Sequence, residues 1–316
     1  MTIPELISGP KTAFTFEVLP PLKGYGIEDL RKTINCLREY EPKYINITHH
    51  RSEYVYREVE GGLMQRQRIR RRPGTVAIAA MLQREYDIPL VPHLLCSGCS
   101  REDIEYALID MQILGIRNLL LLRGDKAKED PYYRPTQGGH SHTTELQEQV
   151  NRFNAGFFDD GSTIRQPGNP FSYGVACYPE KHEEAPNLED DIRIFKRKIE
   201  LGAEYGVTQL FYDNTKYFAF VNRCRELGIT VPIIPGIKPL SKLSQITVVP
   251  RTFRCDLPEP LAHELAKCTT DAEVKQVGIE WATMQCRELM AHGVPSLHFY
   301  TVSAVDSIAQ IAKTIY

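Results

Sequence analysis

The sequence lacks several features that would point to particular classes of protein. It has no apolar run near the roughly 20 residues that a transmembrane helix needs, and its formal charge of -2 gives no general attraction to nucleic acid or anionic membranes. The start of the chain has neither the cationic nor the apolar region of a signal peptide. Eight cysteines without such a signal, and without paired zinc-ligand spacing, are typical of a reduced protein. We therefore expect a cytoplasmic protein that binds neither nucleic acid nor membranes.

Short apolar or β-branched segments alternate with amphipathic segments of helical spacing. The predicted strands are 13–18, 44–48, 88–95, 118–122, 173–177, 208–212, 231–235 and 296–300. The predicted helices are 27–39, 101–114, 143–154, 188–205, 214–227, 271–292 and about 306–313. This alternation suits right-handed βαβ units and predicts an α/β protein, a (β/α)8 TIM barrel of parallel strands. A doubly wound sheet is the alternative, although no G-x-G-x-x-G follows the first strand.

Two regions break this rhythm. Residues 126–172 are long, polar and rich in Gly, Pro, Asn and Asp, and we expect an extended loop and helix insertion there, after the fourth strand. Residues 239–259 are also expected to be irregular. Both would lie on the catalytic face of a single catalytic domain that spans residues 1–316.

Polar side chains recur where the predicted strands end. They are Glu17, Thr48, His93, Arg123, Asp125, Tyr178, Gln209, Asp213 and Thr301. Each alone is more readily explained by structure than by function, but a barrel gathers all eight strand ends at one mouth, which is where the fold places its chemistry.

Glu17 is the best acid–base candidate in this group. It stands inside an apolar strand, between Phe16 and Val18, where burial would keep its carboxyl group protonated. Asp125 is a second carboxylate in a more open context, so two separate roles are available. His49 and His50 are adjacent, and neighbouring residues of a strand point to opposite faces. We therefore predict no metal site.

Several ordered motifs resemble one known family. They are Phe16-Glu17-Val18-Leu19-Pro20-Pro21, Pro92-His93-Leu94, Leu122-Arg123-Gly124-Asp125, Tyr178-Pro179-Glu180-Lys181-His182, Lys196-Arg197-Lys198, Thr208-Gln209-Leu210-Phe211, Ile234-Pro235-Gly236-Ile237 and His298-Phe299-Tyr300-Thr301. Together they look like methylenetetrahydrofolate reductase in its short bacterial form. The resemblance runs from about residue 13 to the end of the printed chain.

The resemblance implies an FAD-dependent barrel that reduces 5,10-methylenetetrahydrofolate to 5-methyltetrahydrofolate in a ping-pong reaction, with NADH or NADPH as the electron donor. It assigns catalytic roles to Glu17 as the acid, to Asp125, which also binds the pterin ring and the flavin, and to Gln209, which also contacts folate. Gln245 matches a further folate contact. The positions that match flavin contacts are Thr48, His93, Arg123, Gly124, Asp125, Tyr178, His182, Asp191, Arg197 and Lys198.

The chain also departs from the family pattern. His49 and His50 stand after Thr48 where Tyr-Gly is common, and His142 replaces a tyrosine beside the flavin; we count His49 and His142 among the expected cofactor-binding residues. Ala304 takes the place of an expected arginine. Two alternatives remain open: a proline dehydrogenase-like flavin barrel that oxidises a small amine, and a flavin- or folate-binding subunit without turnover. The expected partners are small-molecule substrates and, in a homo-oligomer, further copies of the chain.

Overall fold

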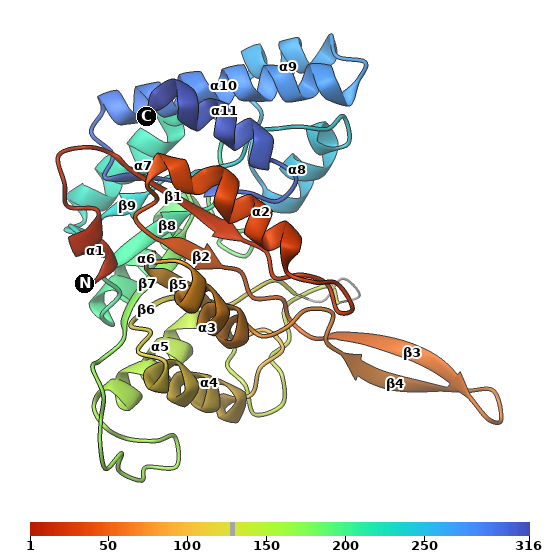
Figure 1. The fold of residues 1–316 in the computed structure, drawn as a ribbon, viewed down its shortest axis with the longest axis vertical. Helices are drawn as coiled ribbons and strands as arrows, with labels where there is room; N and C mark the ends of the chain where they lie inside the picture. Colours follow the sequence, from red (N-terminus) through yellow and green to blue (C-terminus); the bar gives the residue numbers. More distant parts are fainter. Residues whose placement is uncertain (127–129) are drawn as a thin grey trace. The chain divides into compact units, whose positions relative to one another are not determined.

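The computed structural model describes residues 1–126 and 130–316, apart from the side chains of Glu53, Tyr54 and Arg68. Residues 127–129, within the predicted insertion, lie outside the described residues. The chain divides into two compact units (Figure 1). The first unit contains Met1–Val18, Arg31–Asn46 and Ser172–Tyr316, and the second contains Leu19–Leu30 and Ile47–Phe171.

The main sheet has nine strands in the order β10-β11-β1-β2-β5-β6-β7-β8-β9. Their bounds are β1 Ala13–Val18, β2 Ile45–Ile47, β5 Leu90–Leu95, β6 Asn118–Leu122, β7 Ser172–Cys177, β8 Tyr205–Thr208, β9 Ile233–Ile234, β10 Gly236–Ile237 and β11 Ser296–Tyr300. Within the first unit, β9 at the end of this order contacts β11 next to its start. Parallel pairing, with helices between most of the successive strands, confirms the predicted α/β TIM barrel.

Helices follow most strands along the chain. They are α1 Ile3–Leu6, α2 Glu28–Leu37, α3 Thr75–Glu85, α4 Arg101–Ile113, α5 Thr143–Asn154, α6 Leu188–Glu200, α7 Asn214–Glu226, α8 Gln245–Phe253, α9 Glu259–Ala266, α10 Asp271–Ala291 and α11 Val305–Ile315, with a 3-10 turn at Arg38–Tyr40. In the first unit, the long helix α10 lies along α11 (Figure 1).

Helix ends follow the capping rules. Ser100 caps α4: its hydroxyl accepts from Asp103 N at 3.1 Å, and the Asp103 carboxylate accepts from Ser100 N at 2.9 Å. Gly115, with φ 72°, follows the end of the same helix in the left-handed conformation that favours glycine. Asn187 caps α6 by accepting from Asp190 N at 2.9 Å.

The predicted strand 208–212 is wrong, as is the predicted helix end at 205. Helix α6 ends at Glu200, and β8 runs from Tyr205 to Thr208. The ring of Tyr205 lies over Gly174 of β7, where a Cβ atom would be 2.3 Å from the ring, so the pair fits only without a side chain at 174. The apolar run that follows β8 is buried in a core cluster with residues of α8, α9 and α10 instead of in the sheet.

The expectation that residues 239–259 are irregular is also wrong, because α8 occupies Gln245–Phe253. Its residue Val249 is buried in the same cluster, which explains why this segment folds.

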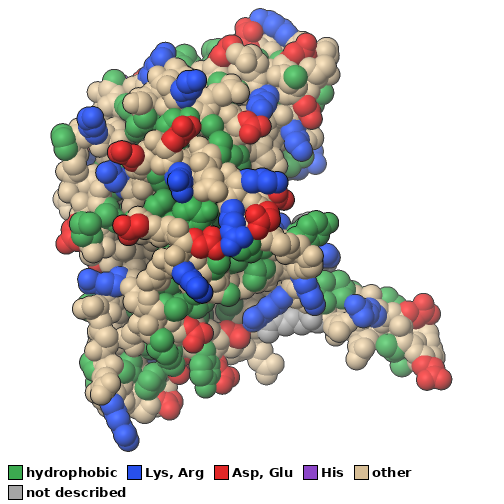
Figure 2. Space-filling view, in the orientation of Figure 1, with side chains coloured by type: hydrophobic (Ala, Val, Ile, Leu, Met, Phe, Trp, Pro, Cys, Tyr) green, Lys and Arg blue, Asp and Glu red, His purple; other side chains and the backbone are tan. Residues whose placement is uncertain are grey.

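The structure adds a β-hairpin that the sequence patterns did not predict. Strands β3 (Glu53–Val59) and β4 (Leu63–Ile69) pair antiparallel through a loop with Gly61 and Gly62, both at positive φ. In Figure 1 the hairpin extends away from α3 and β5 of the same unit. Figure 2 shows charged side chains of both signs along it. Helix α3, after the hairpin, was likewise not predicted.

Candidate active site

Glu17 lies on β1, a strand whose six residues are all buried. Its side chain is 9% exposed, and its backbone carbonyl accepts a hydrogen bond of 2.6 Å from the Thr301 hydroxyl at the end of β11. Burial raises the pKa of the Glu17 carboxyl from 4.5 to about 7, an effect that the nearby Lys238 ammonium opposes. Glu17 therefore keeps its proton up to a pH of about 7, well above the range of a solvated glutamate, as the predicted acid must.

Tyr300 is the neighbour of Glu17 across the sheet, because β1 and β11 pair with Glu17 opposite Tyr300. Its hydroxyl donates to Thr208 O at 2.6 Å, and the ring passes over Gly236, where a Cβ atom would lie 2.6 Å from the ring. Gly236 N in turn donates to the Thr208 hydroxyl at 2.9 Å. These two hydrogen bonds thus link the ends of β8, β10 and β11 beside Glu17.

The carboxamide oxygens of Gln209 and Gln245 accept hydrogen bonds from nearby backbone N–H groups. Gln209 directly follows β8, and its Oε1 accepts from Leu210 N at 2.9 Å. Gln245 opens α8, and its Oε1 accepts from Ser241 N at 2.7 Å and from Lys242 N at 3.2 Å. In each case the contact fixes the orientation of the amide group, so its N–H donors point in a defined direction.

A group of predicted flavin contacts lies at the end of β7 and on α6. Tyr178 and His182 meet edge to face at 4.9 Å. The buried Asp191 carboxylate accepts from His182 N at 2.8 Å, and burial raises its pKa against the effects of that hydrogen bond and of Lys198. Lys198 donates to Ala176 O at 3.1 Å.

The Arg197 side chain is exposed on the same helix. The first unit therefore offers an aromatic surface, a histidine and two cations of the type that bind phosphate groups.

The tip of β6 lies in the second unit. Arg123 stacks over the Tyr133 ring at 4.6 Å. Gly124 has φ 79°, and a Cβ atom there would lie 2.8 Å from Ser97 Cβ, so only glycine fits this turn. Ser97 donates to the carbonyl of Asp125 at 2.9 Å. The Asp125 side chain is exposed, in contrast to the buried Glu17.

Thr48, His49 and His93 also belong to the second unit. Thr48 and His49 directly follow β2 and are half-buried, and His93 is buried in β5. Burial lowers the pKa of His49 to about 4, with smaller contributions from the positive charges of Arg70 and His50. The ring of His49 is therefore neutral at pH 7 and can both donate and accept a hydrogen bond.

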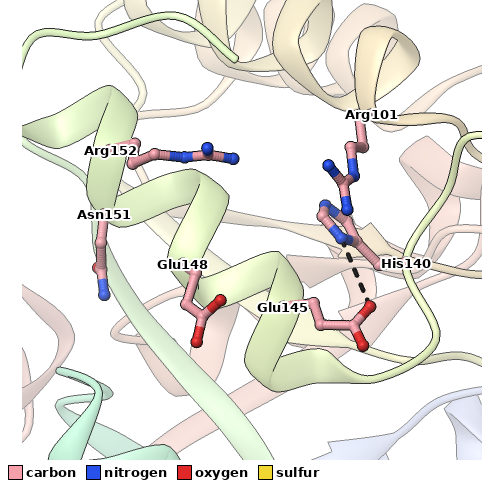
Figure 3. A pocket seen from close by; sticks show the side chains of 6 residues that line it. All are labelled: Arg101, His140, Glu145, Glu148, Asn151 and Arg152. Atoms are coloured by element: carbon pink, nitrogen blue, oxygen red, sulfur yellow. Dashed lines mark ion pairs between the residues drawn. The ribbon is translucent and has the colours of Figure 1, made fainter. Parts of the chain in front are cut away.

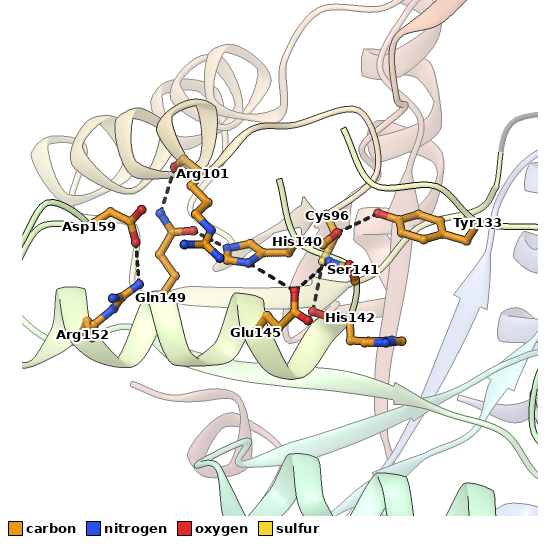
Figure 4. Close-up of polar contacts among 10 residues, drawn as sticks. All are labelled: Cys96, Arg101, Tyr133, His140, Ser141, His142, Glu145, Gln149, Arg152 and Asp159. Carbon is orange, nitrogen blue, oxygen red and sulfur yellow. Dashed lines mark hydrogen bonds and ion pairs between the residues drawn. The ribbon is translucent and has the colours of Figure 1, made fainter. Parts of the chain in front are cut away.

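The segment that leads to His142 is anchored by a polar network in the second unit (Figure 4). His140, 1% exposed, pairs through Nε2 with Gln149 Oε1 at 2.7 Å, and Gln149 donates to Arg101 O at 2.9 Å. Tyr133 donates to His140 O at 3.1 Å. His142 is exposed where α5 begins, and its carbonyl accepts from the Cys96 thiol at 3.6 Å.

A 410 Å³ cavity lies beside this network, between the start of α4 and the more exposed face of α5 (Figure 3). Its lining side chains are Arg101, His140, Glu145, Glu148, Asn151 and Arg152. None of them is a predicted site residue. The lining carries two arginines and two glutamates, together with His140 and Asn151.

The structure thus gathers the predicted residues within each unit. Glu17, Gln209, Gln245, Tyr178, His182, Asp191, Arg197 and Lys198 lie in the first unit, and Thr48, His49, His93, Arg123, Gly124, Asp125 and His142 lie in the second. Sequence reasoning missed Lys238 and did not weigh Tyr300 for a role. The available signal for Lys238 was a cation directly after the apolar strand end Gly236-Ile237.

A parallel α/β barrel that carries a buried acid and other polar side chains at its strand ends has the architecture of a barrel enzyme. The family model described as methylenetetrahydrofolate reductase matches residues 2–316. The chain therefore belongs to the methylenetetrahydrofolate reductase family, and the resemblance seen in its motifs is confirmed.

Relatives from plants and bacteria support this conclusion. Methylenetetrahydrofolate reductase (NADH) 1 of Arabidopsis thaliana is 32% identical over 315 residues, with 96% of this chain and 48% of the relative covered. The chain thus spans about half the length of the plant relatives it matches. The 5,10-methylenetetrahydrofolate reductase of Escherichia coli is 27% identical over 302 residues, with 95% and 90% covered, and that of Pectobacterium carotovorum is 29% identical over 302 residues. In extent the chain matches this short bacterial form.

A solved structure shares the fold. It is a protein from Clostridium thermocellum described as binding two copies of 5-methyl-5,6,7,8-tetrahydrofolic acid, with a TM-score of 0.60, 13% identity, and 98% of this chain and 96% of that chain covered. Over the described residues, no helix is both long and apolar enough to cross a membrane.

Proposed function

We propose that this chain reduces 5,10-methylenetetrahydrofolate to 5-methyltetrahydrofolate, with FAD as the cofactor and NADH or NADPH as the electron donor in a ping-pong sequence. The observation that carries the proposal is Glu17, a carboxyl group buried on a barrel strand and protonated near neutral pH, in a chain of this family. Relatives named for this reaction supply the substrate, and they include one named for NADH and one named for NADPH.

The proposed task of Glu17 is to give a proton to the substrate nitrogen as the methylene bridge opens. A carboxyl group with a pKa near 7 is still protonated at the start of the step and acidic enough to release the proton within it. Asp125, exposed and in the second unit, is proposed to remain available to bind the pterin ring. Gln209, with its carboxamide oxygen engaged by Leu210 N, would present its N–H donors to folate and nicotinamide.

The residues present fit a flavin dinucleotide by their chemistry. In the first unit, Arg197 and Lys198 supply cations for the pyrophosphate, and Tyr178 and His182 supply a firmly packed aromatic pair. In the second unit, Thr48, the neutral His49, His93, Arg123, Gly124 and His142 supply hydrogen-bonding groups and a close backbone turn. When bound, FAD would take a hydride from the pyridine nucleotide and pass it to the folate carbon.

The single catalytic domain over residues 1–316 and a homo-oligomeric assembly are also part of this proposal.

The test begins with the purified protein, which we expect to be yellow or to bind added FAD. Anaerobic mixing with NADH, and separately with NADPH, should bleach the flavin absorbance with at least one donor. Methylenetetrahydrofolate should then restore the absorbance while 5-methyltetrahydrofolate forms. A colourless protein that binds no FAD would contradict the proposal, and so would a reduced flavin that the folate does not reoxidise.

A further inference from the structure

Lys238 and Glu17 lie on either side of Tyr300 in the sheet. Strand β10 pairs with β11 in a register that sets Gly236 beside His298 and Ile237 beside Phe299, so Lys238, the next residue, continues it beside Tyr300. On the other side of β11, the residue paired with Tyr300 is Glu17. An acidic and a basic residue thus lie at the same level of the barrel, on the two strands that flank Tyr300.

The Lys238 side chain is half-buried and fixed in place. Its ammonium group donates to Val302 O at 2.7 Å, in the turn that follows β11. The hydroxyl of Tyr300 is engaged separately, because it donates to Thr208 O across Gly236. Among the residues that the structure describes, the Glu17 carboxylate has no hydrogen bond from either side chain. Lys238 therefore acts on Glu17 through its charge.

The charge of each group opposes the effect of burial on the pKa of the other. Burial lowers the pKa of Lys238, and the Glu17 carboxylate opposes that effect, while Lys238 opposes the rise in the pKa of Glu17. Tyr300 is the other titratable group that faces Glu17 within the first unit, and burial raises its pKa so far that its hydroxyl stays neutral. Of these two neighbours, Lys238 and Tyr300, only Lys238 therefore carries a charge.

We propose that Lys238 is a positioning residue for Glu17: its fixed ammonium charge governs how readily the Glu17 carboxyl group releases its proton to the bound substrate. This inference rests on the proposed function of Glu17 as the acid. The competing role for a cation at this position is direct binding of an anionic group of the substrate, and the two roles change different measured quantities.

The variants Lys238→Met and Lys238→Gln both remove the charge, but the glutamine keeps a hydrogen-bond donor in its side chain. Without the charge, the carboxylate is less stable and Glu17 stays protonated to higher pH. The alkaline limb of the pH profile for folate reduction should therefore move up by about one pH unit in both variants. Lys238→Arg should restore the wild-type limb. Lys242→Met removes an exposed lysine from the same loop and is the matched control, with an unchanged limb.

A second readout does not depend on turnover. The infrared absorption of the protonated Glu17 carboxyl group, identified by its loss in Glu17→Gln, should titrate about one pH unit higher in Lys238→Met and Lys238→Gln than in the wild type. Equal midpoints in all variants would overturn the inference. A higher KM for folate with an unshifted limb would also overturn it and would indicate direct substrate binding. A shifted carboxyl titration in a protein that reduces no folate would instead uphold the coupling and refute the proposed function.

Discussion

The burial of Glu17 predicts an unusual dependence of stability on pH. The pKa of this carboxyl is 4.5 when solvated and about 7 in the folded protein. Below pH 4.5 it is protonated in both folded and unfolded chains and carries no penalty. As the pH rises, the unfolded chain loses the proton first, so the contribution of Glu17 to stability falls and reaches its minimum above about pH 7. A difference of about 2.5 pKa units corresponds to a cost of about 3 kcal/mol.

The variant Glu17→Gln cannot ionise and should escape this cost. We expect its free energy of unfolding, measured by urea denaturation, to gain about 3 kcal/mol relative to wild type between pH 4.5 and pH 8. Any constant offset from the amide group would appear at both pH values and cancels in this comparison. Glu200→Gln, at an exposed position of α6, is the control and should show no such trend. A difference between Glu17→Gln and wild type that does not change with pH would refute the burial argument.

Three further predictions concern packing, capping and titration. Gly174→Ala should lower the free energy of unfolding by about 2 kcal/mol, because its Cβ would collide with the Tyr205 ring, whereas Gly9→Ala, which meets no atom within 4 Å, should change it little in urea denaturation. Ser100→Ala removes the cap of α4 and should cost about 1 kcal/mol in the same assay. With a pKa of about 4, His49 should show no titration of its ring NMR signals between pH 6 and pH 8; a midpoint near 6.5 there would contradict its burial.

The sequence was most informative where local patterns and tertiary packing agree. Ala13–Val18, Asn118–Leu122 and Ser296–Tyr300 form strands with the predicted bounds because each is short, mostly apolar and almost entirely buried. Helix α5 also has its predicted bounds. In each of these segments the local pattern of apolar residues agrees with the burial that the fold imposes.

The errors arose where an apolar run is buried in a different way from the one assumed. Residues 209–212 resemble a strand, but they pack against α8–α10 after β8 has ended.

The hairpin β3–β4 was missed for a different reason: β4 is rich in arginine and glutamine, although Gly61 and Gly62 gave a turn signal.

The predicted site residues came from motifs and from the rule that strand ends carry chemistry. That rule cannot show which side chains share a level of the barrel, because the register of neighbouring strands is set by tertiary packing. The placement of Lys238 and Glu17 beside Tyr300 follows from the pairing of β1 and β10 with β11, so two residues more than 200 positions apart in sequence flank the same tyrosine. No local pattern encodes this pairing.

The most direct test of the central claim is to separate the two half-reactions in Glu17→Gln by anaerobic stopped-flow absorbance, with Glu200→Gln as the control. The account predicts that Glu17→Gln binds FAD and is reduced by NADH or NADPH at nearly the wild-type rate. Its reoxidation by methylenetetrahydrofolate should be slowed at least about 100-fold, the lower range for loss of a general acid. Reoxidation of Glu17→Gln at the wild-type rate would contradict the assignment of Glu17 as the proton donor.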